Sequence, residues 1–512
     1  MLNKRLIVTV GAILVLMPMA IGRSMAEDKI DRSASLRFAW SGAPANYDPP
    51  FSKNQYSDMP YMFPVYDSLI RLGAKGTVVP DLATSWTFSP DGRMLTMTLR
   101  KGVKFTDGSD LTADAVVRSL TRAIKDPASM MAKLLSSLES VEAKDPSTVI
   151  LHLNTPDANV LFPLATSAGM IVSAKALDSG VNLALNPVGS GPYKLVSSGP
   201  QGANFERNEG YFDKSQNQFA KLALLQITDT NARLNALQSG QVDAGLFQAD
   251  QWPQIQGMVQ TGNFTVHSFV EPNSLPLFFN TKVKPFDDKR VRMALNLAVN
   301  RTVINDSIMK GQCPPASQPL QPGVVGHDEN LKVYKQDLEK AKALLQEAGV
   351  GSLTFDAIVS ISEPVASIGL AIQDQLRAIG VTMNIIPTSN NLIRPLFRGG
   401  KHPAMVYQLV VPAPDPASLI DAVYLSPDNP GGVTPEFAKA VADARTKPIG
   451  SPDRETAYKA ISKMAYEDPH HVFICWAPQM IVARKGIVGI EKTAYIDAAP
   501  IPDVRGYGMV AK

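Results

Sequence analysis

The sequence contains 512 residues, of which 45% are hydrophobic and 19% are charged. This balance is typical of a globular protein long enough to bury two sizeable cores. The 50 Lys and Arg residues nearly balance the 47 Asp and Glu residues, and no basic patch indicates a nucleic-acid partner.

The N-terminus is predicted to be a secretory signal peptide. Lys4 and Arg5 supply a basic region, residues 6–21 an apolar region, and a small-x-small cleavage site ends at Ala26. The apolar run is shorter than the roughly 20 residues of a membrane span, and no second long apolar segment follows. We therefore expect cleavage near Ala26, removal of residues 1–26 and a periplasmic location, with an uncleaved anchor as the open alternative. The mature chain then carries 47 charges of each sign.

Residues 79–120 are predicted to form a β-hairpin followed by a helix. Pro90-Asp91-Gly92 has the chemistry of a turn, because glycine tolerates a positive φ. Residues 95–99 alternate apolar side chains with threonine, which is typical of a half-buried strand. Thr112 can cap a helix whose apolar residues fall on one face. This local chemistry predicts a small α+β unit.

The middle and C-terminal parts alternate predicted helices and strands. Thr230, Asp287 and Asp337 each precede apolar residues at helical spacing, so each can cap a helix. Apolar strands are predicted at residues 242–246 and 381–386. Such a strand–helix–strand succession favours open α/β sheets.

The chain has two cysteines, Cys313 and Cys475. Export permits a disulfide, but the sequence sets no distance between the two residues. A bridge and two separate thiols both stay open.

A series of short segments resembles, in order, family 5 of the extracellular solute-binding proteins. That family captures peptides, nickel chelates and related solutes for ABC importers. The resembling segments are YDSL at 66–69, PDLATSW at 80–86, NPVGSGPY at 186–193, LQSGQVD at 237–243, FNT at 279–281, PFDD at 285–288, RVRMA at 290–294 and AKALL at 341–345.

The resemblance implies an α/β, two-lobed periplasmic-binding-protein fold with a two-stranded hinge. Lobe one would comprise residues 27–272 and return in residues 474–512, with an extra subdomain at about 47–183. Lobe two would comprise residues 273–473. Two chain crossings would restrain the lobes to one opening motion better than a single linker.

The resemblance also implies the function. We expect a monomeric binding protein that captures a small solute, with a short peptide favoured, and delivers it to an ABC permease in the inner membrane. We expect no enzymatic activity and no cofactor. The alternatives are a periplasmic chaperone or a chemosensory binding protein without transport, and then a hydrolase.

Asp415 is the first candidate for ligand binding. Asp415-Pro416 matches the position at which peptide-binding family members pair a ligand amino group. A charge-assisted hydrogen bond suits that role, but Asp415 can equally cap the helix that begins at residue 417. The Trp that relatives carry shortly before this Asp is replaced here by Leu409 and Val410, so the ligand's identity stays open.

The resemblance places five further residues near the cleft. They are Asn54, Tyr56, Met59, Tyr407 and Gln408. The first three can equally be ordinary loop or core residues, and one of Tyr407 and Gln408 is expected to face the cleft because strand side chains alternate.

Other polar groups fit structural roles better. Arg394 and Arg398 could meet an anionic ligand, but a pair four residues apart more often forms a solvated helix face. His470 and His471 are adjacent on a predicted strand and point opposite ways, so they make a poor metal chelate. The sequence carries no H-E-x-x-H, P-loop or G-x-S-x-G motif.

Overall fold

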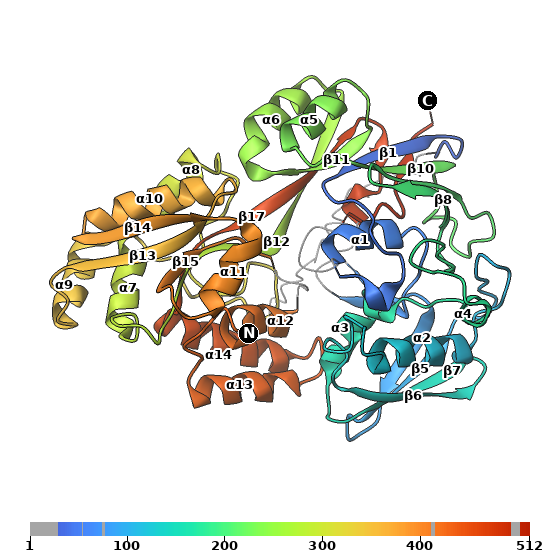
Figure 1. Ribbon diagram of the computed structural model, residues 1–512, viewed down its shortest axis with the longest axis horizontal. Helices are drawn as coiled ribbons and strands as arrows, with labels where there is room; N and C mark the ends of the chain where they lie inside the picture. The colour runs from blue at the N-terminus through green and yellow to red at the C-terminus, as the bar shows by residue number, and fades with distance from the viewer. Residues whose placement is uncertain (1–28, 54, 74–76, 411–414, 493–501, 512) are drawn as a thin grey trace, which may run out of the picture.

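The computed structural model describes residues 29–53, 55–73, 77–410, 415–492 and 502–511. In these residues, eleven strands form one large sheet, which extends through both halves of the molecule (Figure 1). In sheet order the strands are β14 (Val381–Thr388), β13 (Leu353–Ser360), β15 (Ala404–Val406), β12 (Phe264–Phe279), β17 (His471–Arg484), β11 (Ala244–Gln248), β1 (Ser35–Trp40), β10 (Lys221–Gln226), β9 (Gly202–Arg207) and β8 (Tyr193–Gly199), with β16 (Leu409–Val410) beside β12.

The centre of this sheet is an antiparallel pair of two long strands, β12 and β17. Their register runs from Phe264 opposite Arg484 to Phe278 opposite His471. One end of the pair carries β11 and β1, and the other end carries β15 and β13. The pair is therefore the two-stranded hinge that joins lobe one, on the β1 side, to lobe two, on the β13 side.

Helices cover both faces of the sheet. One face packs against α5 (Thr230–Gln238) and α6 (Trp252–Gln260) in lobe one and against α7 (Lys289–Ala298), α9 (Leu338–Glu347) and α10 (Val365–Arg377) in lobe two, around a shared apolar core. The other face packs against α1 (Gln55–Met62) in lobe one. In lobe two it packs against α11 (Asn390–Arg398), α12 (Pro416–Ile420), α13 (Pro435–Arg445) and α14 (Pro452–Glu467).

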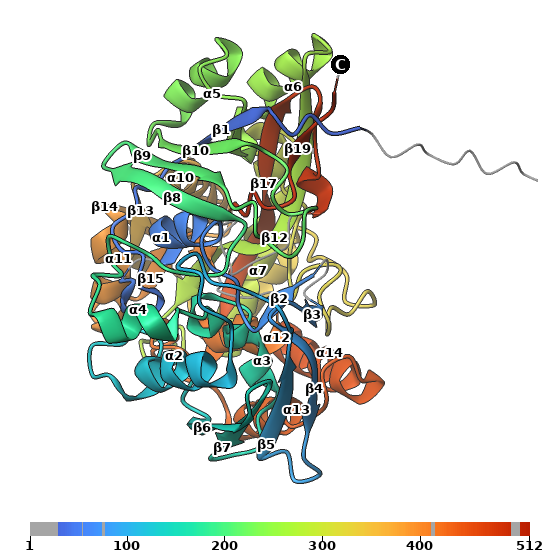
Figure 2. The ribbon, with the colours of Figure 1, turned by 90° about the vertical axis from the view of Figure 1, so that its right-hand side faces the viewer.

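The predicted hairpin and helix form part of a separate four-stranded sheet in lobe one (Figure 2). Its order is β4 (Ala83–Phe88), β5 (Met94–Leu99), β7 (Thr148–Leu153) and β6 (Leu138–Asp145), with α2 (Ala113–Lys125) and α3 (Leu161–Leu164) packed against it. Gly92 has a φ of 70°, as the turn requires, and Thr112 occupies the N-cap of α2. The predicted α+β unit is confirmed.

Two predicted helix caps are displaced by one residue. Helix α5 begins at Thr230 and is capped by Asp229, whose Oδ1 accepts a hydrogen bond from the Ala232 N–H at 2.7 Å. Helix α7 is capped by Asp288 rather than Asp287. In both cases the neighbouring carboxylate has the extended backbone that aims an N-cap acceptor at the first free N–H groups.

The YDSL segment contributes a buried charge network to lobe one. Asp67 accepts hydrogen bonds from Ser190 Oγ and Tyr211 Oη, both at 2.8 Å, and lies 3.7 Å from Arg505 near the C-terminus. Asp81 receives the Ser68 N–H at 3.3 Å. The network links segments of lobe one that are distant in sequence, including the C-terminal segment around Arg505. These segments therefore have a structural role.

The charge network predicts a pH dependence of stability. Burial, and then the nearby charge of Asp67, raises the pKa of Asp81 to about 7. Because the folded protein then holds this proton more tightly than the unfolded chain, the group favours folding below about pH 4 and loses that contribution as pH rises to about 7. Urea unfolding at pH 5 and pH 7 should show that wild type loses stability relative to Asp81→Asn as pH rises. If the difference in stability between wild type and Asp81→Asn is the same at pH 5 and pH 7, this prediction is contradicted.

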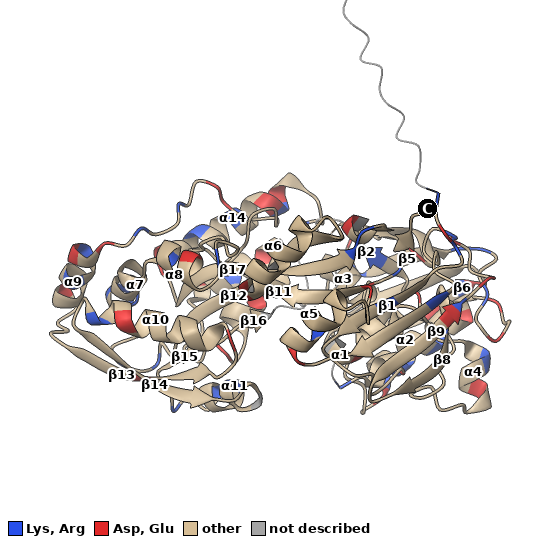
Figure 3. Ribbon diagram, turned by 90° about the horizontal axis from the view of Figure 1, so that it is seen from above, with Lys and Arg blue, Asp and Glu red and all other residues tan. Residues whose placement is uncertain are grey.

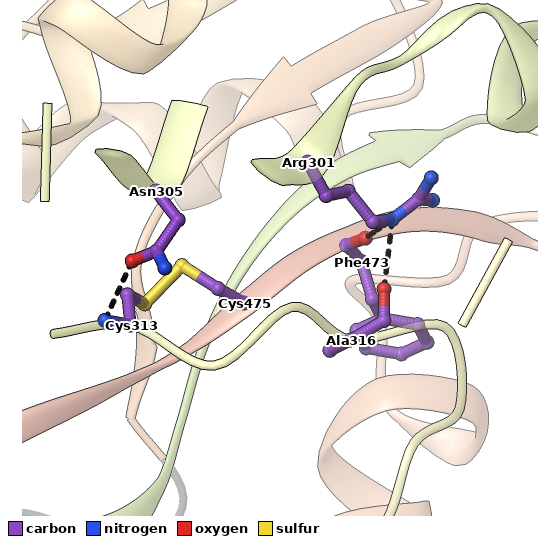
Figure 4. Close-up of a disulfide and its surroundings, with 6 residues drawn as sticks. All are labelled: Arg301, Asn305, Cys313, Ala316, Phe473 and Cys475. Atoms are coloured by element: carbon purple, nitrogen blue, oxygen red, sulfur yellow. Dashed lines mark hydrogen bonds between the residues drawn. A yellow bond between two sulfur atoms is a disulfide. The ribbon is translucent and has the colours of Figure 1, made fainter. Parts of the chain in front are cut away.

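The two cysteines form a disulfide that joins residue 313 to the hinge strand β17 (Figure 4). Backbone bonds reinforce the junction, since the Ala316 N–H donates to Ile474 O and the Trp476 N–H to Pro314 O, both at 3.0 Å. Arg301 Nε donates to Ala316 O and to Phe473 O at 2.8 and 2.7 Å. The question that the sequence left open is thus answered in favour of a bridge.

Basic and acidic residues are distributed over both halves of the molecule (Figure 3). In the part of the chain that the structure describes, no helix combines the length and apolar character that a membrane span requires.

Candidate functional site

The strand directions define a cleft over the middle of the hinge. Strand β11 runs toward lobe two and ends at Gln248, opposite Gln479 of β17. Strand β15 runs the opposite way and ends at Val406, opposite Leu277 of β12. The parallel strands β1 and β10 accompany β11, and β13 accompanies β15. The carboxyl ends of the two groups therefore point toward each other, which is where open α/β sheets bind ligands.

The lobe-one wall of the cleft contains a cavity of about 100 Å³. Arg233 organises this wall, because its guanidinium donates to Leu246 O in the middle of β11 and to Ile227 O just after β10, at 3.2 and 2.7 Å. The cavity is lined by Trp40, Ser41, Thr228, Thr230, Arg233, Leu246, Phe247, Gln248 and Gln479.

Three side-chain oxygens at this edge are buried and receive no hydrogen bond from the described residues. They are Oε1 of Gln479, Oε1 of Gln251 and Oδ1 of Asp250. A buried acceptor without a donor costs free energy comparable to a lost hydrogen bond. The edge is therefore suited to a ligand that brings N–H donors.

Asp250 lies in a negatively charged environment. It follows β11 in lobe one, while Glu363 follows β13 in lobe two. Burial, and to a smaller extent the negative charge of Glu363, raises the pKa of Asp250. Negative charge at this edge favours a ligand that carries a cationic group.

Asp415 occupies the N-cap of α12, one of the two roles expected for it. Its Oδ2 accepts the Ser418 N–H at 3.2 Å, and its Oδ1 accepts a hydrogen bond from Arg454 Nη2 at 2.7 Å. Burial raises the pKa of Asp415, and the charge of Arg454 opposes that rise. Both carboxylate oxygens thus have partners within the chain, and a contact between Asp415 and a ligand stays a prediction.

Arg454 links the two lobes. Its Nη2 donates to Asn159 Oδ1 of the lobe-one subdomain at 2.7 Å as well as to Asp415. Its Nη1 donates to Ala444 O and Lys447 O at 3.3 and 3.2 Å. Sequence reasoning missed Arg454, because an Arg in the first turn of an amphipathic helix gives no signal of a buried partner.

The other predicted ligand residues lie as follows. Asn54 and the side chain of Tyr56 fall outside the described residues, although the backbone of Tyr56 belongs to α1. Met59 is fully buried in the lobe-one core. Tyr407 and Gln408 are half-buried between β15 and β16, beside the hinge.

Arg394 and Arg398 are on helix α11 with 34% and 38% of their side chains exposed, but they are not simply solvated. Both pair with the buried Asp428, through Arg394 Nε at 2.8 Å and Arg398 Nε at 2.6 Å. Asp428 is fully buried, so it needs this countercharge in the lobe-two core. His470 contacts Asn429 Oδ1 at 3.3 Å, and burial lowers the pKa of His470 to about 4, which keeps it neutral.

The fold and the cleft define a two-lobed binding protein, and comparisons with known proteins agree. Residues 77–431 match the family described as bacterial extracellular solute-binding proteins, family 5 Middle. The chain is 28% identical over 424 residues to di/tripeptide-binding protein 2 of Pseudomonas aeruginosa, covering 75% of this chain and 78% of that one. It is 31% identical over 290 residues to glutathione-binding protein GsiB of Escherichia coli, covering 56% of each.

Solved structures share the fold over nearly the whole chain. The Helicobacter pylori periplasmic binding protein DppA in complex with the peptide STSA aligns with a TM-score of 0.78 at 22% identity, covering 94% of this chain and 98% of that one. NikZ from Campylobacter jejuni in complex with Ni(L-His) aligns with a TM-score of 0.76 at 25% identity, covering 93% and 99%.

The chain belongs to family 5 of the bacterial extracellular solute-binding proteins. It is a non-enzymatic transport receptor, the solute-binding component of an ABC importer.

Proposed function

We propose that this protein captures a short peptide or a similar solute with a free amino group and delivers it to an ABC permease in the inner membrane. The observation that carries the proposal is the set of unpartnered acceptors at the cleft edge, Gln479 Oε1, Gln251 Oε1 and Asp250 Oδ1. Peptides supply both N–H donors and an ammonium group, and the relatives that bind peptides or glutathione support this class.

Closure of the lobes is the proposed mechanism. Residues 27–272 with 474–512 would move as lobe one, including the subdomain at about 47–183, and residues 273–473 as lobe two. A ligand that touches both walls stabilises the closed form, because only there does it make all its contacts. Shifting the equilibrium from 1:99 to 99:1 requires about 5.5 kcal/mol of differential affinity.

The proposal places the mature protein in the periplasm as a monomer, after cleavage near Ala26. The disulfide is consistent with an oxidising compartment. Of the residues predicted from the resemblance, Asn54, Tyr56, Tyr407 and Gln408 are proposed to contact the ligand. Met59 and Asp415 stay proposed ligand residues as well, and both are buried.

Calorimetric titration with di- and tripeptides, free or N-acetylated, tests the proposal. The purified mature protein should bind the free peptides, and Asp250→Asn should weaken that binding at least about tenfold, or about 1.4 kcal/mol. Asp287→Asn is the matched control, because Asp287 is an exposed carboxylate that follows the lobe-two end of β12, beside the start of β15 rather than its cleft end, and should leave affinity unchanged.

Three results would contradict the proposal. They are the absence of peptide binding, equal affinity of Asp250→Asn and wild type, and preference for the N-acetylated peptides. Turnover of the peptide, followed by mass spectrometry, would indicate a hydrolase. Normal import of a bound ligand by a deletion strain would favour a chaperone or a chemosensory binding protein.

A further inference from the structure

A second cavity lies between the lobes, away from the hinge. Its volume is about 570 Å³, and both lobes contribute to its walls. Lobe one supplies Val78, Trp86, Phe88 and Leu161, and lobe two supplies Pro448 and Ile449. We call it the seam cavity. It is near the contact of α3 with the ends of α13 and α14, which both views show side by side (Figures 1 and 2).

The seam cavity is separate from the cleft over the hinge. None of its lining residues lies at the carboxyl end of a strand of the large sheet, and none belongs to β12 or β17. Trp86 and Phe88 are on the same side of strand β4, the edge strand of the subdomain sheet, because alternate residues of a strand share a face.

The lining has little capacity for polar recognition. Asp157 is the one charged residue among the described residues that line it, and its carboxylate is already occupied. Asp157 Oδ2 accepts a hydrogen bond from Ser137 Oγ at 2.7 Å, and Oδ1 accepts the Asn159 N–H at 3.0 Å. Ser89 Oγ donates to Asp91 at 2.5 Å. The aromatic, aliphatic and proline side chains therefore decide what the cavity accepts.

Arg454 fastens the two walls to each other. On the lobe-two side it donates a hydrogen bond to Lys447 O, next to Pro448 and Ile449. On the lobe-one side it reaches Asn159, which adjoins Asp157 and Ala158 in the opposite wall. The cavity is therefore complete only while the lobes are in contact.

We propose that the seam cavity is a second binding site, which takes a neutral apolar molecule with a flat or aromatic part. Its volume falls in the range of about 300–1,000 Å³ that small-molecule sites occupy. The inference rests on the proposed closure, because such a molecule touches both walls only when the lobes meet. By linkage, an occupant of the seam and a solute in the cleft each raise the affinity for the other.

Fluorescence titration of the mature protein with N-phenyl-1-naphthylamine, a neutral apolar probe, tests the site. Wild type should bind the probe saturably, one per protein. Trp86→Ala removes an aromatic from the lobe-one wall, and Ile449→Glu places a charge in the lobe-two wall. Each should weaken binding at least about tenfold. Leu185→Glu is the matched control, because Leu185 is 64% exposed elsewhere on lobe one, and it should bind as wild type does.

Ile449 is only half-buried in a loop, so Ile449→Glu should fold normally, which a circular dichroism melt can verify. Non-saturable binding, or equal affinity of wild type and Ile449→Glu, would overturn the site. The proposed function is judged separately by peptide titration, so peptide binding without probe binding would refute the seam site alone. If wild type binds the probe, both wall variants lose that binding and no peptide binds, the proposed solute is refuted. The seam site is then supported.

Discussion

Arg454→Met is expected to lower the free energy of unfolding by about 3–5 kcal/mol, because it leaves a buried carboxylate without its partner. Asp415 is 2% exposed and receives Arg454 Nη2 at 2.7 Å. The carbonyls of Ala444 and Lys447 each lose the hydrogen bond from Arg454 in the same variant. Urea denaturation followed by circular dichroism gives the measurement.

An exposed ion pair on α10 provides the control for Arg454. Arg377 lies 3.6 Å from Asp374, and both side chains are largely exposed. Arg377→Met should therefore cost less than about 1 kcal/mol. The double variant Arg454→Met/Asp415→Leu should recover part of the loss, because the uncompensated charge is then gone. Equal small losses for Arg454→Met and Arg377→Met would contradict a buried, essential pair.

Removing the disulfide is expected to cost about 3–5 kcal/mol in the variant Cys313→Ala/Cys475→Ala. The bridge closes a loop with a sequence separation of 162 residues, so it restricts the unfolded chain strongly. It also holds the segment at residue 313 against hinge strand β17. Both cysteines are fully buried, so a reductant reaches the bridge only when the protein unfolds.

Comparing urea midpoints with and without dithiothreitol isolates the bridge. Unfolding in the reductant should destabilise wild type to about the level of the double alanine variant, while the variant itself should not respond. If wild type and the variant unfold at the same urea concentration under oxidising conditions, the bridge does not stabilise the fold.

The sequence allowed prediction of features that depend on neighbouring residues. The turn at Gly92, the cap by Asp337 and the strand that begins at Val381 all follow from local chemistry, and all are present. The one-residue errors at Asp229 and Asp288 arise because adjacent polar residues compete for the same cap. The two-lobed arrangement came from the resemblance, since no local pattern pairs β12 with a strand that begins about 200 residues later.

The candidate site could be predicted only in outline. Asp415 was expected either to cap a helix or to bind a ligand, and the cap is present. Its partner Arg454 is 39 residues further along, and Asn159 is 295 residues from Arg454, so neither contact leaves a trace in sequence spacing. The acceptors Asp250 and Gln479 could not be predicted together, because only the pairing of β11 with β17 brings them to one edge.

Closure of two lobes around an unmodified solute is the central claim, and small-angle X-ray scattering of the mature protein tests it most directly. The scattering should be recorded without ligand and with a saturating free peptide identified by calorimetry. Lobe closure should give a smaller radius of gyration in the presence of the peptide. Identical scattering curves with and without a demonstrably bound peptide would contradict it.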